Sequence, residues 1–215
     1  MKKIDIKPIS TENHQKIIAQ GAEAIITLEN NIITKNRISK SYRIKELDKK
    51  IIKLRTRAEN KILTKVKKII NVPKVLEVTP NKITMEFIDG LRLSENLNGF
   101  TKEEQIKILE KIGKEISKLH KENIIHGDLT TSNMILKNKK IYLIDFGLGY
   151  QNGKYEDKAV DIHLLKQALE AKHFKFHKEL FQSFKSGYLK IDTIESKKVL
   201  ERLIAVEKRG RYKKH

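Results

Sequence analysis

Two short loops, each containing an aspartate, constrain the fold of this chain more than any other feature of its sequence. The first loop is His126-Gly127-Asp128-Leu129-Thr130-Thr131-Ser132-Asn133, and the second is Asp145-Phe146-Gly147. In phosphoryl-transfer sites, an Asp accepts the proton of the attacking hydroxyl, and an Asn five positions later holds magnesium beside the phosphates. The spacing therefore predicts Asp128 as the catalytic carboxylate and Asn133 as a metal ligand. We interpret His126 as a residue that positions the loop rather than as a general base.

The second loop supplies the other predicted metal ligand. Asp145 follows an apolar strand-like run, residues 141–144, and Gly147 then permits a tight turn. An Asp in this place binds the magnesium ion that bridges the β- and γ-phosphate oxygens of ATP. We therefore expect ATP as the cofactor, together with Mg²⁺ and, as the alternative ion, Mn²⁺.

Such a centre also needs a Lys that contacts the α- and β-phosphates and a helical Glu that holds this Lys in place. Lys35 ends the strand-like run Ile32-Ile33-Thr34-Lys35 and is the predicted catalytic and nucleotide-binding Lys. Lys40 is the alternative, but residues 39–43 lack the alternating apolar pattern of a central strand. Glu59 is the predicted partner carboxylate, although a Glu among basic residues on a helix is also compatible with a solvated surface pair.

Two further segments are candidates for nucleotide binding. Gln20-Gly21-Ala22-Glu23-Ala24 lies in the position of a phosphate-binding loop, but it has one Gly where the usual kinase loop has three. Its backbone amides would therefore enclose phosphate less closely. Met85-Glu86-Phe87-Ile88 joins the two halves of the chain and would offer backbone groups to an adenine.

The motifs depart from the ordinary protein-kinase pattern in two ways. Gly127 stands in the place of an Arg that normally pairs with a phosphorylated activation loop, so a switch of that kind is not expected. No Ala-Pro-Glu motif follows, and only about a dozen residues separate Gly147 from the next predicted helix, near Ala159. The sequence therefore lacks the segments with which protein kinases dock peptide substrates.

Hydrophobic periodicity predicts an α+β chain whose first third is mixed and whose remainder is mostly helical. Predicted hairpins pair residues 24–28 with 32–35, 75–78 with 83–88, and 134–136 with 141–144. Helices are predicted over residues 45–71, 101–119, 159–171, 178–188 and 193–207, the second of them starting with a capping box of Thr101 and Glu104. Pro73 is expected to end the first helix, in which one apolar stripe recurs at steps of three and four.

Composition narrows the possible partners and compartments. The 215 residues are enough for one domain with two closely coupled lobes. A formal net charge of +19 favours a polyanionic partner or an anionic substrate, and the absence of Cys excludes thiolate catalysis and thiolate-held metals. No apolar run is long enough to span a bilayer, so we expect a cytoplasmic protein without membrane contact.

Taken together, these motifs resemble the small atypical kinase of the KEOPS complex, which supports threonylcarbamoyladenosine formation in tRNA. The resemblance covers most of the chain. It is carried by the segment from Gln20 to Ala24, by Ser41-Tyr42-Arg43, Leu47-Asp48 and Arg55-Thr56-Arg57-Ala58-Glu59, by the two Asp loops, by Glu156-Asp157-Lys158-Ala159-Val160-Asp161 and by Arg209-Gly210-Arg211.

The resemblance implies a minimal two-lobed protein-kinase-like fold in a single domain. It implies a small β-rich N-lobe with one long helix (1–86), a mainly helical C-lobe (87–207) and a basic C-terminal tail (208–215). It also implies a Ser/Thr kinase that behaves largely as an ATPase in its complex. Its partners would be the threonylcarbamoyl transferase, the other KEOPS subunits and tRNA, which is modified next to the anticodon. The family pattern assigns the roles given above to the same residues and adds Asp161 as a brace of the catalytic loop.

Two basic segments are candidates for contact with RNA. Residues 35–61 contain eleven Lys and Arg against three Asp and Glu. In the tail, we predict contacts with nucleic acid or a partner protein from Arg209, Arg211, Tyr212, Lys213 and Lys214, with the Tyr ring available for stacking. A solvated helix face and a frayed basic terminus are the alternative interpretation.

Three other functions compete with this one. A small-molecule phosphotransferase of the aminoglycoside or choline kinase type shares His-Gly-Asp and the downstream Asn and Asp, but it usually adds a larger, acidic helical region. Here the region after Asp145 is short and rich in Lys. A RIO-type kinase is a nearer relative, against which the segments peculiar to the KEOPS family argue. A catalytically silent, tRNA-binding scaffold is disfavoured because Lys35, Asp128, Asn133 and Asp145 are all present.

Overall fold

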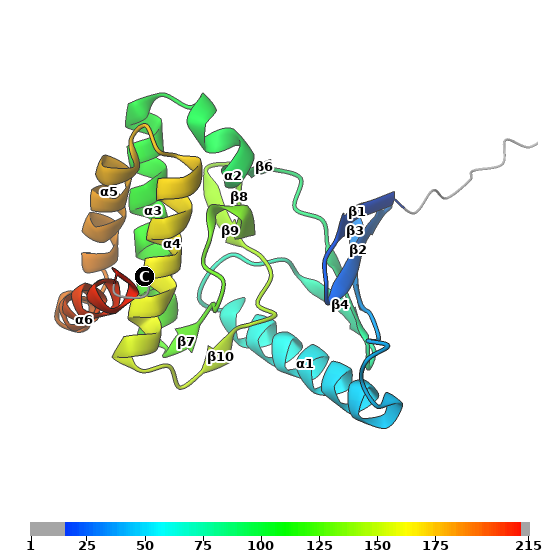
Figure 1. The fold of residues 1–215 in the computed structure, drawn as a ribbon. Helices are drawn as coiled ribbons and strands as arrows, with labels where there is room; N and C mark the ends of the chain where they lie inside the picture. Colours follow the sequence, from blue (N-terminus) through cyan, green and yellow to red (C-terminus); the bar gives the residue numbers. More distant parts are fainter. Residues whose placement is uncertain (1–15, 212–215) are drawn as a thin grey trace, which may run out of the picture.

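The computed structural model describes residues 16–211, which form a strand-rich N-lobe and a mostly helical C-lobe (Figure 1). The N-lobe contains β1 (Lys16–Gln20), β2 (Ala24–Glu29), β3 (Ile32–Arg37), α1 (Lys45–Val66), β4 (Val75–Val78) and β5 (Lys82–Glu86). The C-lobe contains β6 (Leu91–Arg92), α2 (Leu93–Asn96), η1 (Leu97–Gly99), α3 (Lys102–Lys121), β7 (Ile124–Ile125), η2 (Thr131–Asn133), β8 (Met134–Lys137), β9 (Lys140–Leu143), β10 (Tyr150–Gln151), α4 (Tyr155–Lys172), α5 (His177–Leu189) and α6 (Thr193–Arg211). The predicted α+β class and two-lobed arrangement are confirmed.

The N-lobe is built on one antiparallel sheet with the strand order β1-β2-β3-β5-β4. The turn between β2 and β3 consists of Asn30 and Asn31, whose φ angles of 49° and 61° are left-handed. Two consecutive left-handed residues make a type I′ turn, which Asn tolerates and which matches the twist of a hairpin. The predicted hairpin is therefore confirmed, and β3 lies at the centre of the sheet.

Helix α1 is shorter than predicted and only partly buried. It ends at Val66, whose carbonyl accepts hydrogen bonds from the backbone N–H groups of Ile69 (2.9 Å) and Ile70 (3.0 Å). The prediction that the helix continues to residue 71 and is stopped by Pro73 is wrong, because this local turn closes the helix first. The apolar stripe is also not buried throughout, since Leu47 and Leu54 are about half exposed.

The C-lobe is organised around the pair α3 and α5. The predicted capping box of α3 is confirmed: Thr101 N–H donates to Glu104 Oε2 (2.9 Å) and Glu104 N–H donates to Thr101 Oγ1 (3.3 Å). The two helices approach through glycines. A Cβ atom at Gly113 would lie 2.1 Å from the carbonyl oxygen of Phe184, and one at Gly187 would lie 2.0 Å from that of Glu110. The helices therefore pack backbone against backbone.

Helices α4 and α6 are both longer than predicted. Helix α4 begins at Tyr155 rather than at 159, because the Asp157 carboxylate accepts the Lys154 N–H (2.7 Å) and caps the first turn. Helix α6 continues to Arg211, so the first residues assigned to a tail are helical. Arg209 forms an ion pair with Glu156 on α4. Tyr212, Lys213 and Lys214 lie outside the described residues.

The lobes are joined by the C-terminal end of α1 and by the segment after β5. Ile62, Leu63 and Val66 belong to the same buried apolar cluster as the core of α3, α4 and α5. Beyond the helix, Leu143 N–H donates to Asn71 O (3.0 Å). Among residues 16–211, none of the helices combines the length and the apolar character that crossing a bilayer requires.

Candidate active site

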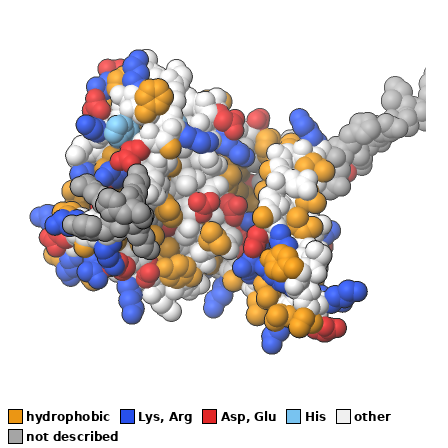
Figure 2. All heavy atoms as spheres, viewed as in Figure 1, with side chains coloured by type: hydrophobic (Ala, Val, Ile, Leu, Met, Phe, Trp, Pro, Cys, Tyr) orange, Lys and Arg blue, Asp and Glu red, His pale blue; other side chains and the backbone are white. Residues whose placement is uncertain are grey.

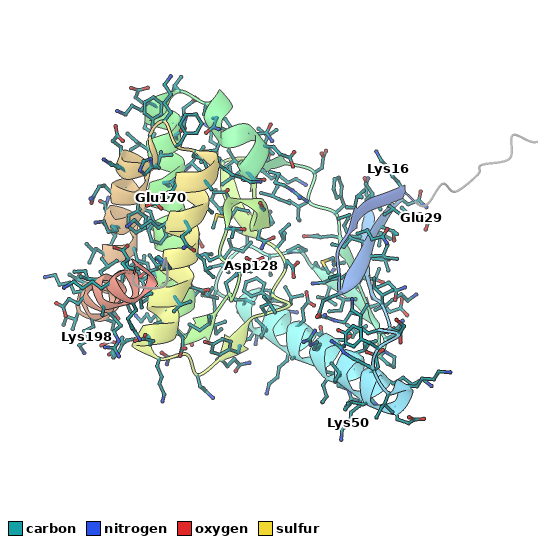
Figure 3. The ribbon with its side chains drawn as sticks, viewed as in Figure 1. Lys16, Glu29, Lys50, Asp128, Glu170 and Lys198 are labelled. Atoms are coloured by element: carbon teal, nitrogen blue, oxygen red, sulfur yellow. The ribbon has the colours of Figure 1, made fainter. Side chains whose placement is uncertain are left out.

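A cleft of about 260 Å³ lies between the two lobes. Its N-lobe wall includes Ile18, Ala19, Ile26, Ile33, Lys35 and Glu59, the connecting segment contributes Met85, Glu86, Phe87 and Ile88, and the C-lobe contributes Arg92, Ser132, Asn133, Ile135, Ile144 and Asp145. Figure 3 shows Asp128 on the side of the C-lobe that faces this cleft. A larger groove of about 580 Å³ between α5 and α6 contains none of the predicted site residues.

The cleft brings together three charged residues that are far apart in the sequence. Lys35 Nζ on β3 donates to Glu59 Oε1 on α1 (2.7 Å) and to Asp145 Oδ1 (2.7 Å). Lys40, the alternative, instead donates to the carbonyl oxygen of Ala22. The geometry therefore favours Lys35 over Lys40 and makes Glu59 its helical partner.

Electrostatic interactions favour the charged forms of Lys35 and Asp145. Burial by itself would lower the pKa of Lys35, but the carboxylates of Glu59 and Asp145 outweigh burial and raise it. For Asp145, burial would raise the pKa, but the ammonium group of Lys35 and the Gly147 N–H (3.1 Å from Asp145 Oδ1) lower it. Asp145 also has a left-handed φ of 62°, a backbone strain typical of functional sites.

Arg37 is a member of this cluster that sequence analysis did not identify. Its Nη2 atom donates to Glu59 Oε2 (2.6 Å), and its Nη1 atom lies 3.9 Å from Glu23 Oε2 in the predicted phosphate-binding loop. Glu23 is also paired with Arg55 on α1, and the hydrogen bond from Arg55 lowers the pKa of the Glu23 carboxyl. A chain of alternating charges therefore connects the phosphate-binding loop to Glu59 and Lys35.

The catalytic loop is closed by its own Asn. Asn133 Nδ2 donates to the carbonyl oxygen of Asp128 (2.9 Å) and to its carboxylate Oδ2 (2.8 Å). These two bonds orient the Asp128 carboxylate beside Asn133, although Asp128 itself is not among the residues that line the cleft. The amide oxygen of Asn133, Oδ1, is left to bind a cation. The short helix η2, Thr131–Asn133, sets this spacing.

His126 and Asp161 are buried and make contacts with the backbone of the loop that contains Asp128. His126 is fully buried, and burial lowers the pKa of its imidazole. Its Nδ1 accepts the Asp128 N–H (3.3 Å) and its Nε2 faces the carbonyl oxygen of Ile144 (3.1 Å), so one neutral tautomer satisfies both contacts. Asp161 on α4 accepts the backbone N–H groups of His126 (2.7 Å) and Gly127 (2.8 Å). His126 thus contacts both Asp loops, and Asp161 contacts the first of them from α4, which is the placement that the expected positioning roles require.

Position 127 requires glycine for two reasons. Gly127 has a φ of +82°, and a Cβ atom there would lie 2.3 Å from the carbonyl oxygen of Leu148. An Arg at this position would need a strained backbone and would displace the segment after Asp145. The departure from the protein-kinase pattern is therefore built into the packing of the two loops.

The predicted phosphate-binding loop lies at the rim of the cleft. Gln20, Gly21, Ala22, Glu23 and Ala24 connect β1 to β2, and Gly21 N–H donates to Ala24 O (3.0 Å). None of the five is among the residues that line the cleft, whereas Ile18 and Ala19 on the preceding strand are. A contact between this loop and a phosphate would therefore be made from the rim of the cleft.

Asn133 and Asp145 fit a magnesium ion that is shared with a nucleotide. Mg²⁺ prefers oxygen ligands and is usually held by one or two side chains together with phosphate oxygens and water. The two residues lie on the same wall of the cleft. Within residues 16–211, no group of three or more His, Cys, Asp and Glu forms a metal cage.

Comparisons with known proteins place these features in a family. Residues 14–152 match the RIO domain family. The KEOPS complex subunit Bud32 of Pyrococcus abyssi is 43% identical over 212 residues, which are 92% of this chain and 96% of that protein. The probable serine/threonine-protein kinase BUD32 homolog of Archaeoglobus fulgidus is 37% identical over 193 residues, 89% of this chain and 94% of that protein.

A third relative is longer. A probable bifunctional tRNA threonylcarbamoyladenosine biosynthesis protein of Methanosarcina barkeri is 35% identical over 219 residues, 99% of this chain but only 38% of that protein. The contrast drawn from the sequence between a RIO-type kinase and the KEOPS family is too strict, since this chain matches both. The chain contains a RIO domain, and it belongs to the Bud32 family.

Proposed function

We propose that this chain is an ATP- and Mg²⁺-dependent Ser/Thr kinase with ATPase activity that acts in a KEOPS complex during threonylcarbamoyladenosine modification of tRNA. The observation that supports it best is the cluster of Lys35, Glu59 and Asp145 in a cleft that Asn133 also lines, with Asp128 hydrogen-bonded to Asn133. The names of the relatives, a KEOPS complex subunit and a tRNA threonylcarbamoyladenosine biosynthesis protein, support the setting.

The proposed reaction transfers the γ-phosphoryl group of ATP to water or to a Ser/Thr hydroxyl. Asp128 accepts the proton of that hydroxyl while its oxygen forms a bond to the γ-phosphorus. The bond between the γ-phosphorus and the β,γ-bridging oxygen breaks, and ADP leaves. Lys35 donates to the α- and β-phosphates in place of Asp145, while Glu59 keeps it oriented. Bound Mg²⁺ would neutralise charge on the phosphates, and Asn133 and Asp145 would hold it.

The remaining assignments follow from the same proposal. Met85, Glu86, Phe87 and Ile88 line the cleft where an adenine would lie. The threonylcarbamoyl transferase, the other KEOPS subunits and tRNA are the proposed partners, in the cytoplasm and away from membranes. The proposed contacts of the tail, from Arg209 to Lys214, are supported only by the positive charge of this segment.

The test measures ADP and phosphoprotein formed from γ-labelled ATP, with Mg²⁺ or with Mn²⁺, in the presence and absence of a tRNA transcript and the partner transferase. The variants are Asp145→Asn, Asp128→Asn and Lys35→Met, with Lys40→Met as the matched control. We expect turnover to fall by at least about a hundredfold in the first three. Lys40→Met should keep most of the activity, because its ammonium group lies outside the cleft cluster.

Two results would contradict the proposal. Turnover that persists in Asp145→Asn would place the chemistry elsewhere. The absence of Asp145-dependent turnover under every condition, with tRNA modification by the assembled complex unchanged in Asp128→Asn, would leave a nucleotide-binding scaffold instead.

A further inference from the structure

The outward face of α1 carries a row of five cations, Lys50, Lys53, Arg57, Lys61 and Lys65, which we call the α1 stripe. All five side chains are exposed. Steps of three and four residues place them on one side of the helix. At a rise of 1.5 Å per residue the row is about 22 Å long and presents about one cation per turn.

Only the first turn of α1 places a carboxylate beside the α1 stripe, because Glu46 is exposed and lies four residues before Lys50. Of the three acidic residues of α1, Glu46 lies in the first turn, Asp48 is buried and paired with Arg43, and Glu59 is buried and paired with Lys35. Within the described part of the chain, residues 16–211, none of the five stripe residues forms an ion pair with a carboxylate. The charges of the five cations are therefore not neutralised by ion pairs, although Glu46 lies next to Lys50 at one end of the row.

Several lysines on the C-lobe helices differ from those of the α1 stripe. Six of the C-lobe lysines form ion pairs, namely Lys102 with Glu179, Lys114 with Glu110, Lys118 with Glu115, Lys166 with Glu207, Lys190 with Glu110 and Lys198 with Glu195. Like charges at steps of three and four destabilise a helix. Helix α3 also carries lysines at these steps, at positions 107, 111, 114, 118 and 121, but two of them are ion-paired. Helix α1 thus keeps more of this electrostatic cost, which a bound polyanion would relieve.

The α1 stripe is also accessible. The buried contacts of α1 with the C-lobe core come from its end, through Ile62, Leu63 and Val66. The first half of the helix projects away from the helical lobe (Figure 1), and Lys and Arg side chains surround the projecting end (Figure 2). Lys50 lies on this outer part (Figure 3). A long, stiff ligand can therefore lie along the row without meeting the C-lobe.

We propose that the α1 stripe binds the phosphate backbone of an RNA. This rests on the proposed function, which supplies tRNA as the partner. The row offers cations at a regular spacing and no aromatic or amide side chain that could read a base, as expected for a contact to backbone alone. A protein interface would instead be depleted in Lys and centred on apolar anchors. Two half-exposed leucines, Leu47 and Leu54, lie on the same side of α1 as the row, but its five cations outnumber them.

The test compares two full-length triple variants with the same change in net charge. One replaces three of the five cations of the row (K50Q, K53Q and R57Q), and the other replaces three exposed C-lobe lysines (K121Q, K172Q and K197Q). The dissociation constant for an unmodified tRNA transcript is measured from 50 to 200 mM NaCl. The stripe variant should bind about tenfold more weakly at the low salt concentration and lose about 2 to 3 from the slope of log K against log salt. The C-lobe variant should change the affinity by less than about twofold.

Three outcomes would overturn the proposal. Equal weakening in both variants would mean that net charge alone governs binding. If the stripe variant loses as much affinity for polyglutamate as for the RNA, the row would be a site for an acidic protein surface. If it loses as much affinity for vesicles with 30% phosphatidylserine, the row would be a membrane site. Urea midpoints should be the same for all three proteins, because the replaced side chains are exposed.

ATP turnover without RNA separates this proposal from the proposed function. If Asp145-dependent turnover is found and the stripe variant binds RNA like the wild type, only the α1 stripe is wrong. If RNA binding depends on the α1 stripe but no Asp145-dependent turnover exists, the catalytic proposal fails and the RNA site stands.

Discussion

Glu59 binds two cations, one with each carboxylate oxygen. Oε1 accepts from Lys35 and Oε2 accepts from Arg37. When the phosphates of a nucleotide engage Lys35, Arg37 still holds Glu59 against β3. We therefore expect Arg37 to position Lys35, the predicted catalytic Lys. The backbone of Arg37 is fixed in the sheet, opposite Ala24 at the end of the predicted phosphate-binding loop.

Replacing this second cation should impair nucleotide use. In Arg37→Met, the buried Oε2 of Glu59 loses its partner and competes for Lys35. We expect kcat/KM for ATP turnover to fall by about tenfold or more, with a raised KM, and Arg37→Lys to recover part of the loss. Arg202→Met, which removes an exposed Arg from α6, is the control. An unchanged KM in Arg37→Met would reduce Arg37 to a structural role.

The sequence predicts the members of this cluster unequally. Asp128, Asn133 and Asp145 follow a fixed spacing that few other functions require, so they can be identified without a structure. Arg37 could not be identified in that way. It lies two positions after Lys35, which puts both side chains on the same face of a strand, but only the sheet shows that this face is buried against Glu59.

At the scale of elements, the contact of α3 with α5 is the tightest constraint on packing. Because Gly113 and Gly187 let the two backbones touch, any side chain there must separate the helices. This contact fixes α3, which leads into the strand β7 just before the catalytic loop.

Gly187→Ala should therefore be strongly destabilising. Its Cβ would lie 2.0 Å from the Glu110 carbonyl oxygen, and we expect a loss of about 2 to 3 kcal/mol in the free energy of unfolding. Gly99→Ala is the matched control, since a Cβ there meets nothing within 4 Å and should leave stability within about 1 kcal/mol of the wild type. Urea denaturation measures both, and similar midpoints for the two variants would contradict the packing described here.

The boundaries of elements could be predicted where a local signal sets them. The Asn30-Asn31 turn and the Thr101 capping box are each determined by a few adjacent residues. The end of α1 is set instead by backbone bonds to Val66 and by its burial in the other lobe, which periodicity does not reveal. Leu47 and Leu54 continue the apolar pattern of α1, but they are half exposed because the C-lobe does not extend to this part of the helix.

For the whole molecule, two buried histidines link stability to pH. His126 lies between the Asp loops, and His173 contacts Thr131 Oγ1 (3.1 Å) and Asn98 Oδ1 (2.7 Å). Burial lowers the pKa of both imidazoles below the ordinary value of 6.5. The unfolded chain therefore binds more protons than the folded chain once the pH falls below about 6.5.

The free energy of unfolding should thus decrease as the pH falls from about 7 to about 5. Each buried His contributes a slope of up to about 1.4 kcal/mol per pH unit. Carboxyl groups with lowered pKa values lose their contribution only below this window. In urea titrations, His126→Gln and His173→Gln should each flatten the slope, whereas His177→Gln, which alters an exposed ring, should not. A slope that is unaffected by the first two variants would show that other groups titrate.

Helix α1 is attached to the C-lobe at one end, and this gives the molecule a lever. Its 22 residues span about 33 Å, with the pivot near Val66. A tilt of about 5° would move the outer end by about 3 Å but Glu59, which is nearer the pivot, by only about 1 Å. That smaller displacement is enough to break the 2.7 Å hydrogen bond between Lys35 and Glu59. A displacement of the exposed tip therefore reaches the cleft reduced about threefold, as a fine adjustment of the predicted catalytic Lys.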